Sequence, residues 1–186
     1  MGAFLIEFVL FGVTGLLPTF AIAVGFGSEV GFSLIAILNG ASCLGRITTG
    51  MVGDRLGHLN FLITMISIVI IITGVIFVPF GTKHIGALYT FAALWGYGSG
   101  SFLSCSPVCV GKTCEPKDYG RYVGTMNFFV SFSLLVTVPV GGQMLDSMGG
   151  MALSGFYLAV IFLGGGCFFA ARTLLLDGRT IFRAII

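Results

Sequence analysis

The chain has 186 residues, of which 56% are hydrophobic and only 9% are charged, and its formal net charge is +2. A soluble domain carries roughly 25% charged residues, so the composition excludes a water-soluble fold and predicts apolar side chains that face lipid or one another. The small net charge provides no basic surface that would favour nucleic acid as a partner.

Six apolar stretches follow one another along the chain. A membrane-spanning helix requires about 20 predominantly apolar residues, and glycine, proline and charged residues separate the stretches that reach this length. We therefore predict an all-α membrane domain of six transmembrane helices over residues 1–176, followed by a cytoplasmic tail at 177–186. In chain order the predicted spans are 3–24, 32–52, 61–80, 85–106, 122–145 and 151–176.

The basic residues give these spans an orientation. Short cytoplasmic loops of membrane proteins are enriched in Lys and Arg. With the N-terminus in the cytoplasm, all but one of the nine Lys and Arg residues fall on the cytoplasmic side, and only Lys83 falls outside. We predict a multi-pass protein with both termini in the cytoplasm and the plasma membrane as its location.

The most informative segment follows the second predicted span. Residues 50–57 contain the spacing G-x-x-x-D-R-x-G, formed by Gly50, Asp54, Arg55 and Gly57. Gly50 is expected to permit close helix packing, and Gly57 is expected to allow a tight turn with positive φ. Asp54 and Arg55 are expected at the membrane surface, where a charge is tolerated.

This spacing and its place in the chain resemble the signature loop of the major facilitator superfamily, which follows the second helix of each six-helix half. The resemblance implies that Asp54 and Arg55 join a charge cluster that stabilises one conformation against a neighbouring helix. His58 and Leu59 depart from the pattern, because many members carry two basic residues there, and the departure weakens the predicted cluster.

Nearly the whole chain is similar to the C-terminal half of a monocarboxylate-transporter-like protein of the fungal type. The similarity rests on residues 45–60, on the glycine-rich residues 97–102 and on Pro-x-x-Gly at 139–142. It implies a secondary active transporter that moves a small organic solute by alternating access, with a monocarboxylate-like anion as the first candidate. Fungal relatives include carriers of other compounds, such as vitamins. Proton is a candidate co-substrate, and no cofactor is implied.

Arg46 is the first candidate for substrate binding. A charge inside a bilayer is costly and marks a functional site by default, and guanidinium can bind a carboxylate through two parallel hydrogen bonds. In the transporters that the chain resembles, an arginine four residues before a glycine pairs with the substrate carboxylate, and Arg46 precedes Gly50 by that spacing. The alternative is an arginine whose side chain extends to the inner interface.

Three further polar residues are candidates for the wall of a substrate cavity. Asn39, Ser42 and Arg46 are spaced at i, i+3 and i+7, which places them on one helical face; hydrogen bonding to a neighbouring helix is the alternative. Ser42 stands where animal members carry an Asp that shares in proton coupling, so the resemblance does not carry that pair over. Asn127, with Ser131 one turn later, is the third candidate.

Other functional classes find little support in the sequence. His58 and His84 fall on opposite predicted sides of the membrane, so they cannot form one catalytic dyad, and no hydrolase motif occurs. Cys105, Cys109 and Cys114 lack the spacing of metal ligands. We therefore predict neither an enzyme nor a metal site.

Six helices are half of a major facilitator transporter, so the resemblance implies a missing N-terminal half or a second copy as the partner. The sequence leaves three possibilities open: a fragment of a longer protein, a half-size protein that dimerises, and a non-transporting remnant or structural membrane protein. If more chain precedes Met1, Glu7 lies inside the membrane and is a candidate proton-linked group; otherwise it lies at the interface.

Overall fold

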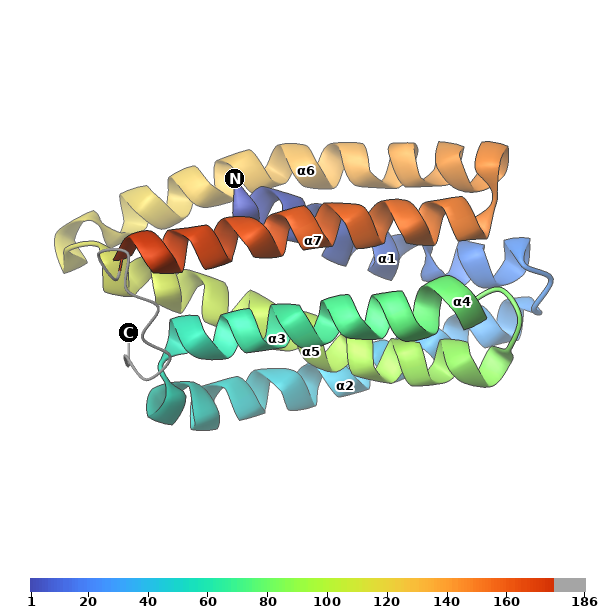
Figure 1. The fold of residues 1–186 in the computed structure, drawn as a ribbon, viewed down its shortest axis with the longest axis horizontal. Coiled ribbons are helices and arrows are strands. Elements are labelled where there is room, and N and C mark those ends of the chain that lie inside the picture. Colours follow the sequence, from blue (N-terminus) through green and yellow to red (C-terminus); the bar gives the residue numbers. More distant parts are fainter. Residues whose placement is uncertain (176–186) are drawn as a thin grey trace.

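Residues 1–175 are almost entirely helical. The structure, a computed structural model, describes residues 1–175, and its long helices run side by side along one axis (Figure 1). The predicted tail at 177–186 lies outside the described residues. The elements are α1 (Gly2–Ala23), α2 (Ser28–Leu56), α3 (His58–Ile72), the π-helical turn η1 (Thr73–Phe77), α4 (Val78–Phe80), α5 (Ile85–Thr113), the 3-10 turn η2 (Pro116–Asp118), α6 (Tyr119–Met148) and α7 (Gly150–Leu175).

Within residues 1–175, five helical segments are long and apolar enough to cross a membrane. Helix α5 is as long as α2, but glycine and serine at residues 96–106 lower its hydropathy. The structure thus supports a multi-pass, all-helical membrane domain, with five of the six predicted spans. These five are Gly2–Ala23, Ser28–Arg55, His58–Phe80, Pro116–Met148 and Gly150–Leu174.

The helices extend beyond most of the apolar stretches that predicted them. Helix α2 continues to Leu56 and α3 begins at His58, so the predicted loop at 53–60 is reduced to Gly57. The φ of Gly57 is 84°, which no right-handed helix accommodates. The break between the fourth and fifth predicted spans shortens in the same way, because α5 reaches Thr113. Polar residues at these ends remain helical, because water can solvate their side chains while the backbone groups keep their intrahelical hydrogen bonds.

Glycines bring α2 and α5 into the most extensive helix contact of the described chain. A β-carbon at Gly45 would overlap the backbone oxygen of Tyr97, and one at Gly96 would overlap the backbone oxygen of Leu38. The Ser101 hydroxyl donates a hydrogen bond of 3.1 Å to the carbonyl oxygen of Gly45. The glycine-rich stretch of α5 therefore serves helix packing, as small residues do between membrane helices.

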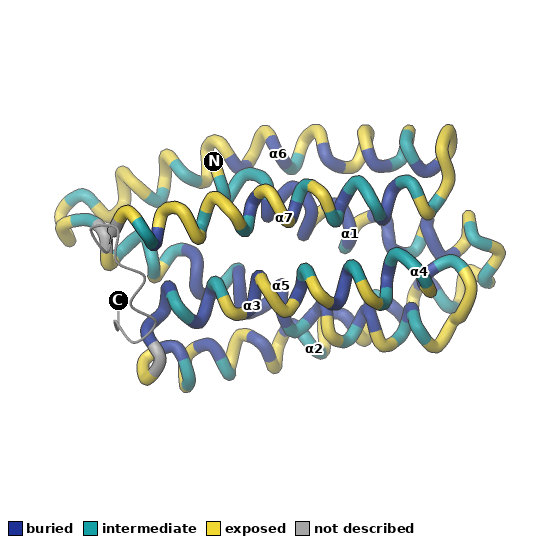
Figure 2. The backbone as a smooth tube through the Cα atoms, in the orientation of Figure 1, coloured by how far each residue is buried: buried dark blue, intermediate teal, exposed yellow. Residues whose placement is uncertain are grey.

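Aromatic rings fill the core near the α4 end of the bundle. The ring centroids of Phe20 and Phe77 are 5.0 Å apart, those of Phe77 and Phe91 are 4.3 Å apart, and those of Phe91 and Trp95 are 5.3 Å apart. Trp95 is fully buried in this stack. Figure 2 shows the buried segments turned toward the interior of the bundle and the exposed segments along the outer sides of α6 and α7.

The basic side chains gather at one end of the bundle. At this end α2 turns into α3 and α5 turns into α6, whereas Lys83 lies at the opposite end, between α4 and α5 (Figure 1). We call the end at which α2 meets α3 and α5 meets α6 the basic end. Its described residues include Arg55, Lys112, Lys117, Arg121 and Arg172.

Candidate functional site

Arg46 lies inside α2, far from both of its ends. It precedes Leu56, the last residue of α2 at the basic end, by about ten residues, which is about 15 Å at the rise of an α-helix. The hydrocarbon core of a bilayer is about 30 Å thick. Arg46 therefore lies near mid-depth if Leu56 marks the membrane surface, and its side chain is exposed on the described bundle.

The three polar residues that were predicted on one face of α2 lie in two different environments. Asn39 is exposed like Arg46, and their separation of seven residues is close to two helical turns, so both project from the same side of α2. Ser42 is only 7% exposed and lies where α2 contacts Gly100 of α5. Asn39 and Arg46 thus occupy an open face, and Ser42 borders that face from inside the α2–α5 contact.

Asn127 lies on α6, on the other side of α1. Helix α1 packs against both α2 and α6. Asn127 is exposed, and its backbone oxygen accepts a hydrogen bond of 2.9 Å from the hydroxyl of Ser131. The structure therefore places the helices that carry Arg46 and Asn127 on either side of α1, without a contact between these two side chains among the described residues.

Among residues 1–175, Glu7 and Arg172 are charged residues that the bundle buries. Glu7 is 7% exposed in the first third of α1. Arg172 is 4% exposed near the end of α7, and its Nε donates a hydrogen bond of 2.8 Å to Oδ1 of Asn60. Sequence reasoning counted Arg172 only as a basic residue of the cytoplasmic side. Its place in the last turn of an apolar helix was the available signal that it needs a partner.

The signature segment forms the sharp turn between α2 and α3. Gly57 adopts the predicted positive φ, and Asp54 and Arg55 are exposed in the last turn of α2. The packing assigned to Gly50 needs a correction, because no described atom lies within 4 Å of the place where its β-carbon would be. Gly53 makes the close contact instead, since its β-carbon would lie 3.2 Å from the ring of His58.

Substitution of Gly57 by Ala should destabilise this turn. The φ of 84° is strained for any residue with a β-carbon, and the cost is about 1–2 kcal/mol. Gly50→Ala is the matched control, because Gly50 lies in a right-handed helix with no described neighbour within 4 Å. Thermal unfolding in detergent should show a lower midpoint for the first variant and no loss for the second. Equal midpoints would mean that the turn can change its backbone conformation without a cost in stability.

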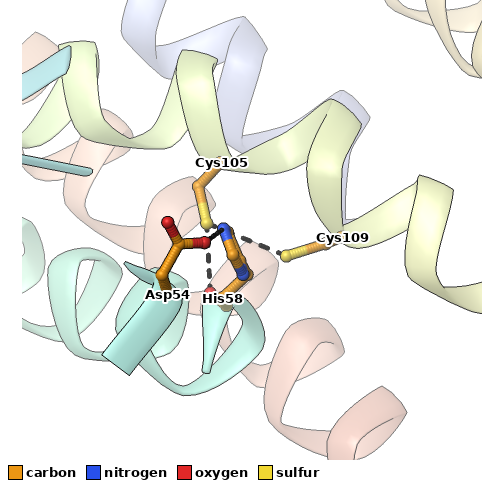
Figure 3. A network of polar contacts seen from close by, with 4 residues as sticks. All are labelled: Asp54, His58, Cys105 and Cys109. Atoms are coloured by element: carbon orange, nitrogen blue, oxygen red, sulfur yellow. Dashed lines mark hydrogen bonds and ion pairs between the residues drawn. The ribbon is translucent and has the colours of Figure 1, made fainter. Parts of the chain in front are cut away.

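His58 links this turn to α5, as Figure 3 shows. Its Nε2 lies 3.5 Å from Oδ1 of Asp54, and its backbone oxygen accepts a hydrogen bond of 3.1 Å from Sγ of Cys105. The Sγ atoms of Cys105 and Cys109 are 3.8 Å apart. His58, one of the two residues at which the sequence departs from the signature pattern, thus contributes to the contact between α3 and α5 at the basic end.

The sequence predicted no metal site. Among residues 1–175, no three His, Cys, Asp or Glu side chains are already gathered closely enough to hold an ion. No covalent bond joins the cysteines, and Cys43 and Cys167 are exposed.

Comparison with known proteins identifies the family. The sequence profile of the Major Facilitator Superfamily matches residues 1–181. The MFS-type transporter opdF of Penicillium oxalicum is 33% identical over 159 residues, which are 85% of this chain and 37% of that protein. The riboflavin transporter MCH5 of Saccharomyces cerevisiae is 32% identical over 128 residues, which are 69% of this chain and 24% of that protein.

A third relative extends the similarity along the chain. The agnestins efflux protein AgnL12 of Paecilomyces divaricatus is 29% identical over 183 residues, which are 97% of this chain and 41% of that protein. The chain thus spans about two fifths or less of the length of these relatives. They are transporters rather than enzymes. From the apolar helices, the signature turn at Gly57 and these matches, we conclude that the chain belongs to the major facilitator superfamily.

Proposed function

We propose that this chain is the C-terminal six-helix half of a secondary transporter of the monocarboxylate-transporter-like type, which moves a small organic anion by alternating access. Arg46 carries this proposal. A permanently charged guanidinium near the middle of a span, exposed on the face of α2, requires a polar partner. A substrate carboxylate meets that requirement with two parallel hydrogen bonds.

The open face of α2, together with α1 and α6 beside it, is the proposed wall of the substrate cavity. Asn39 and Asn127 are its proposed hydrogen-bonding groups, and Ser42 borders it. The opposite wall comes from an N-terminal half or a second copy of the chain, since sites of this kind lie between two halves. The buried carboxyl of Glu7 is the proposed proton carrier. We place the basic end in the cytoplasm and the protein in the plasma membrane, from the distribution of Lys and Arg.

The relatives widen the range of solutes to be tested. One is named a riboflavin transporter, and others are named efflux proteins for agnestins and aspyridones. A panel for this protein therefore includes small monocarboxylates, larger organic acids and riboflavin. Both directions of transport need to be measured.

The proposal is tested by counterflow in liposomes that contain the purified protein carrying this chain. Vesicles loaded with one unlabelled solute are diluted into the same solute in labelled form, and label inside the vesicles is measured. The matched control for each acid is its neutral amide, which is close in size but has no carboxylate to pair with Arg46. We expect transient accumulation of at least one acid and not of its amide.

Two other outcomes would contradict the proposal. Accumulation of acid and amide alike would show that no carboxylate is recognised, which removes Arg46 from the substrate site. Accumulation of no solute on the panel, by protein that elutes from size exclusion as a single folded species, would favour a non-transporting remnant or structural membrane protein.

A further inference from the structure

A cavity of about 270 Å³ lies at the basic end of the bundle. Its wall is built by the first turn of α1 together with residues of α3, α5, α6 and α7, which are far apart in the sequence. None of the residues named above for the wall of the substrate cavity lines it. The cavity is therefore a separate feature of the described bundle, and its shape and chemistry indicate a ligand of its own.

The cavity follows α5 inward from the end of that helix. Lys112 lines it in the last turn of α5 and is exposed, whereas Ser106 lines it six residues earlier in the chain and is only 4% exposed. Six residues of an α-helix span about 9 Å. The cavity thus has a charged mouth that is open to solvent and an inner end that lies within the bundle.

The inner part of the cavity suits an apolar group. The Ser106 hydroxyl already donates to Sδ of Met126 over 3.8 Å, and Sγ of Cys109 lies 3.8 Å from Sγ of Cys105. An apolar group at this depth therefore separates none of these polar atoms from its partner, which keeps the cost of excluding water small. The larger apolar side chains of the lining are Leu59, Val110 and Phe168.

The mouth of the cavity suits a single negative charge. Among the described residues that line the cavity, Lys112 is the only Lys or Arg, and no Asp or Glu is present. No carboxylate of residues 1–175 forms a salt bridge with Lys112. One carboxylate matches one ammonium, whereas a phosphate monoester carries a charge of about −1.5 to −2 at neutral pH and needs more donors than one lysine offers.

We propose that this cavity binds a medium-chain fatty acid, with the carboxylate at Lys112 and the hydrocarbon chain directed inward past Cys109. A water molecule takes about 30 Å³ in the liquid, so a volume of about 270 Å³ corresponds to about nine waters. Octanoate, with roughly ten non-hydrogen atoms of similar size, fills such a volume. A phospholipid with two long chains exceeds it. The site does not depend on the transport function proposed above.

The test is photocrosslinking of an octanoate analogue that carries a diazirine on its chain. The purified protein that carries this chain is held in nanodiscs of neutral phospholipid, and crosslinks are assigned to peptides and quantified by mass spectrometry. We expect crosslinks on the peptides that line the cavity and competition by unlabelled octanoate. Each methylene removed from the competitor should weaken it by about fourfold, whereas chains longer than octanoate should gain nothing once the cavity is full.

Charge recognition is tested by removing the ammonium from the protein or the charge from the ligand. Lys112→Met should weaken crosslinking to the cavity peptides by about fivefold, the contribution of one lysine near a membrane surface, and octanamide should compete less well than octanoate by the same factor. Lys117→Met is the matched control, because Lys117 pairs with Glu115 at 2.6 Å and does not line the cavity. Arg46→Ala should crosslink at the cavity like the wild type, so this site and the proposed substrate site are tested separately.

Three outcomes would overturn the site. The first is equal crosslinking of Lys112→Met and the wild type, in protein that elutes at the same volume in size exclusion. The second is an equal loss in Lys112→Met and Lys117→Met, which would show a general attraction of anions to the basic end. The third is a competitor strength that keeps rising with chain length beyond octanoate, which would show partition into the lipid.

Discussion

Substitution of Arg46 by Ala should abolish most carboxylate transport without changing the amount of protein in the membrane. A hydrogen bond to a charged group contributes about 1.5–3 kcal/mol, which corresponds to a loss of about 10- to 100-fold in apparent affinity. Arg46 is exposed on the described bundle, so its truncation leaves the core intact. Counterflow at a series of substrate concentrations measures the apparent affinity for the carboxylate, and an immunoblot measures the amount of protein in the membrane.

Two further variants distinguish substrate recognition from a general effect of charge. Arg46→Lys keeps the charge but replaces a planar fork with a point charge, so it should restore only part of the affinity. Arg121→Ala removes an exposed basic residue near the start of α6, at the basic end, and should behave like the wild type. If Arg46→Ala transports as well as Arg121→Ala, Arg46 has no part in binding the solute.

The sequence predicted the helical membrane domain because its signal is local. Each apolar stretch is visible without knowledge of its neighbours, and the positive φ of Gly57 follows from a glycine placed after a charged pair. The ends of the helices were harder to predict from the sequence. Hydropathy marks where a helix leaves the lipid, whereas the backbone of α2 stays helical to Leu56 and that of α5 to Thr113.

The contacts at the basic end could not be read from the sequence because they join distant segments. Cys105 contacts a backbone atom 47 residues away in His58, and Arg172 bonds Asn60 across 112 residues. Their formation depends on how α3 packs between α5 and α7, which no local pattern specifies. The burial of Ser42 has the same origin, since it follows from the approach of Gly100 on α5 and not from the periodicity of α2.

A single methyl group at Gly45 should disrupt the bundle, whereas the same group at Gly40 should not. In Gly45→Ala the added β-carbon would overlap the backbone oxygen of Tyr97 and would lie 3.1 Å from Oγ of Ser101. A backbone atom cannot move aside as a flexible side chain can, so α2 and α5 must separate. Overpacking costs typically about 1–3 kcal/mol, and displacement of the most extensive helix contact should place Gly45→Ala at the upper end of that range.

Gly40 is the matched control on the same helix. It lies five residues before Gly45, and no described atom lies within 4 Å of the place where its β-carbon would be. Ala also favours a helix over Gly by about 1 kcal/mol, so Gly40→Ala should raise the unfolding midpoint slightly, whereas Gly45→Ala should lower it by several degrees. Equal midpoints in thermal unfolding would mean that α2 and α5 are not in close backbone contact. In that case Ser42 would be free to join Asn39 and Arg46 on the open face, and the substrate wall would include all three.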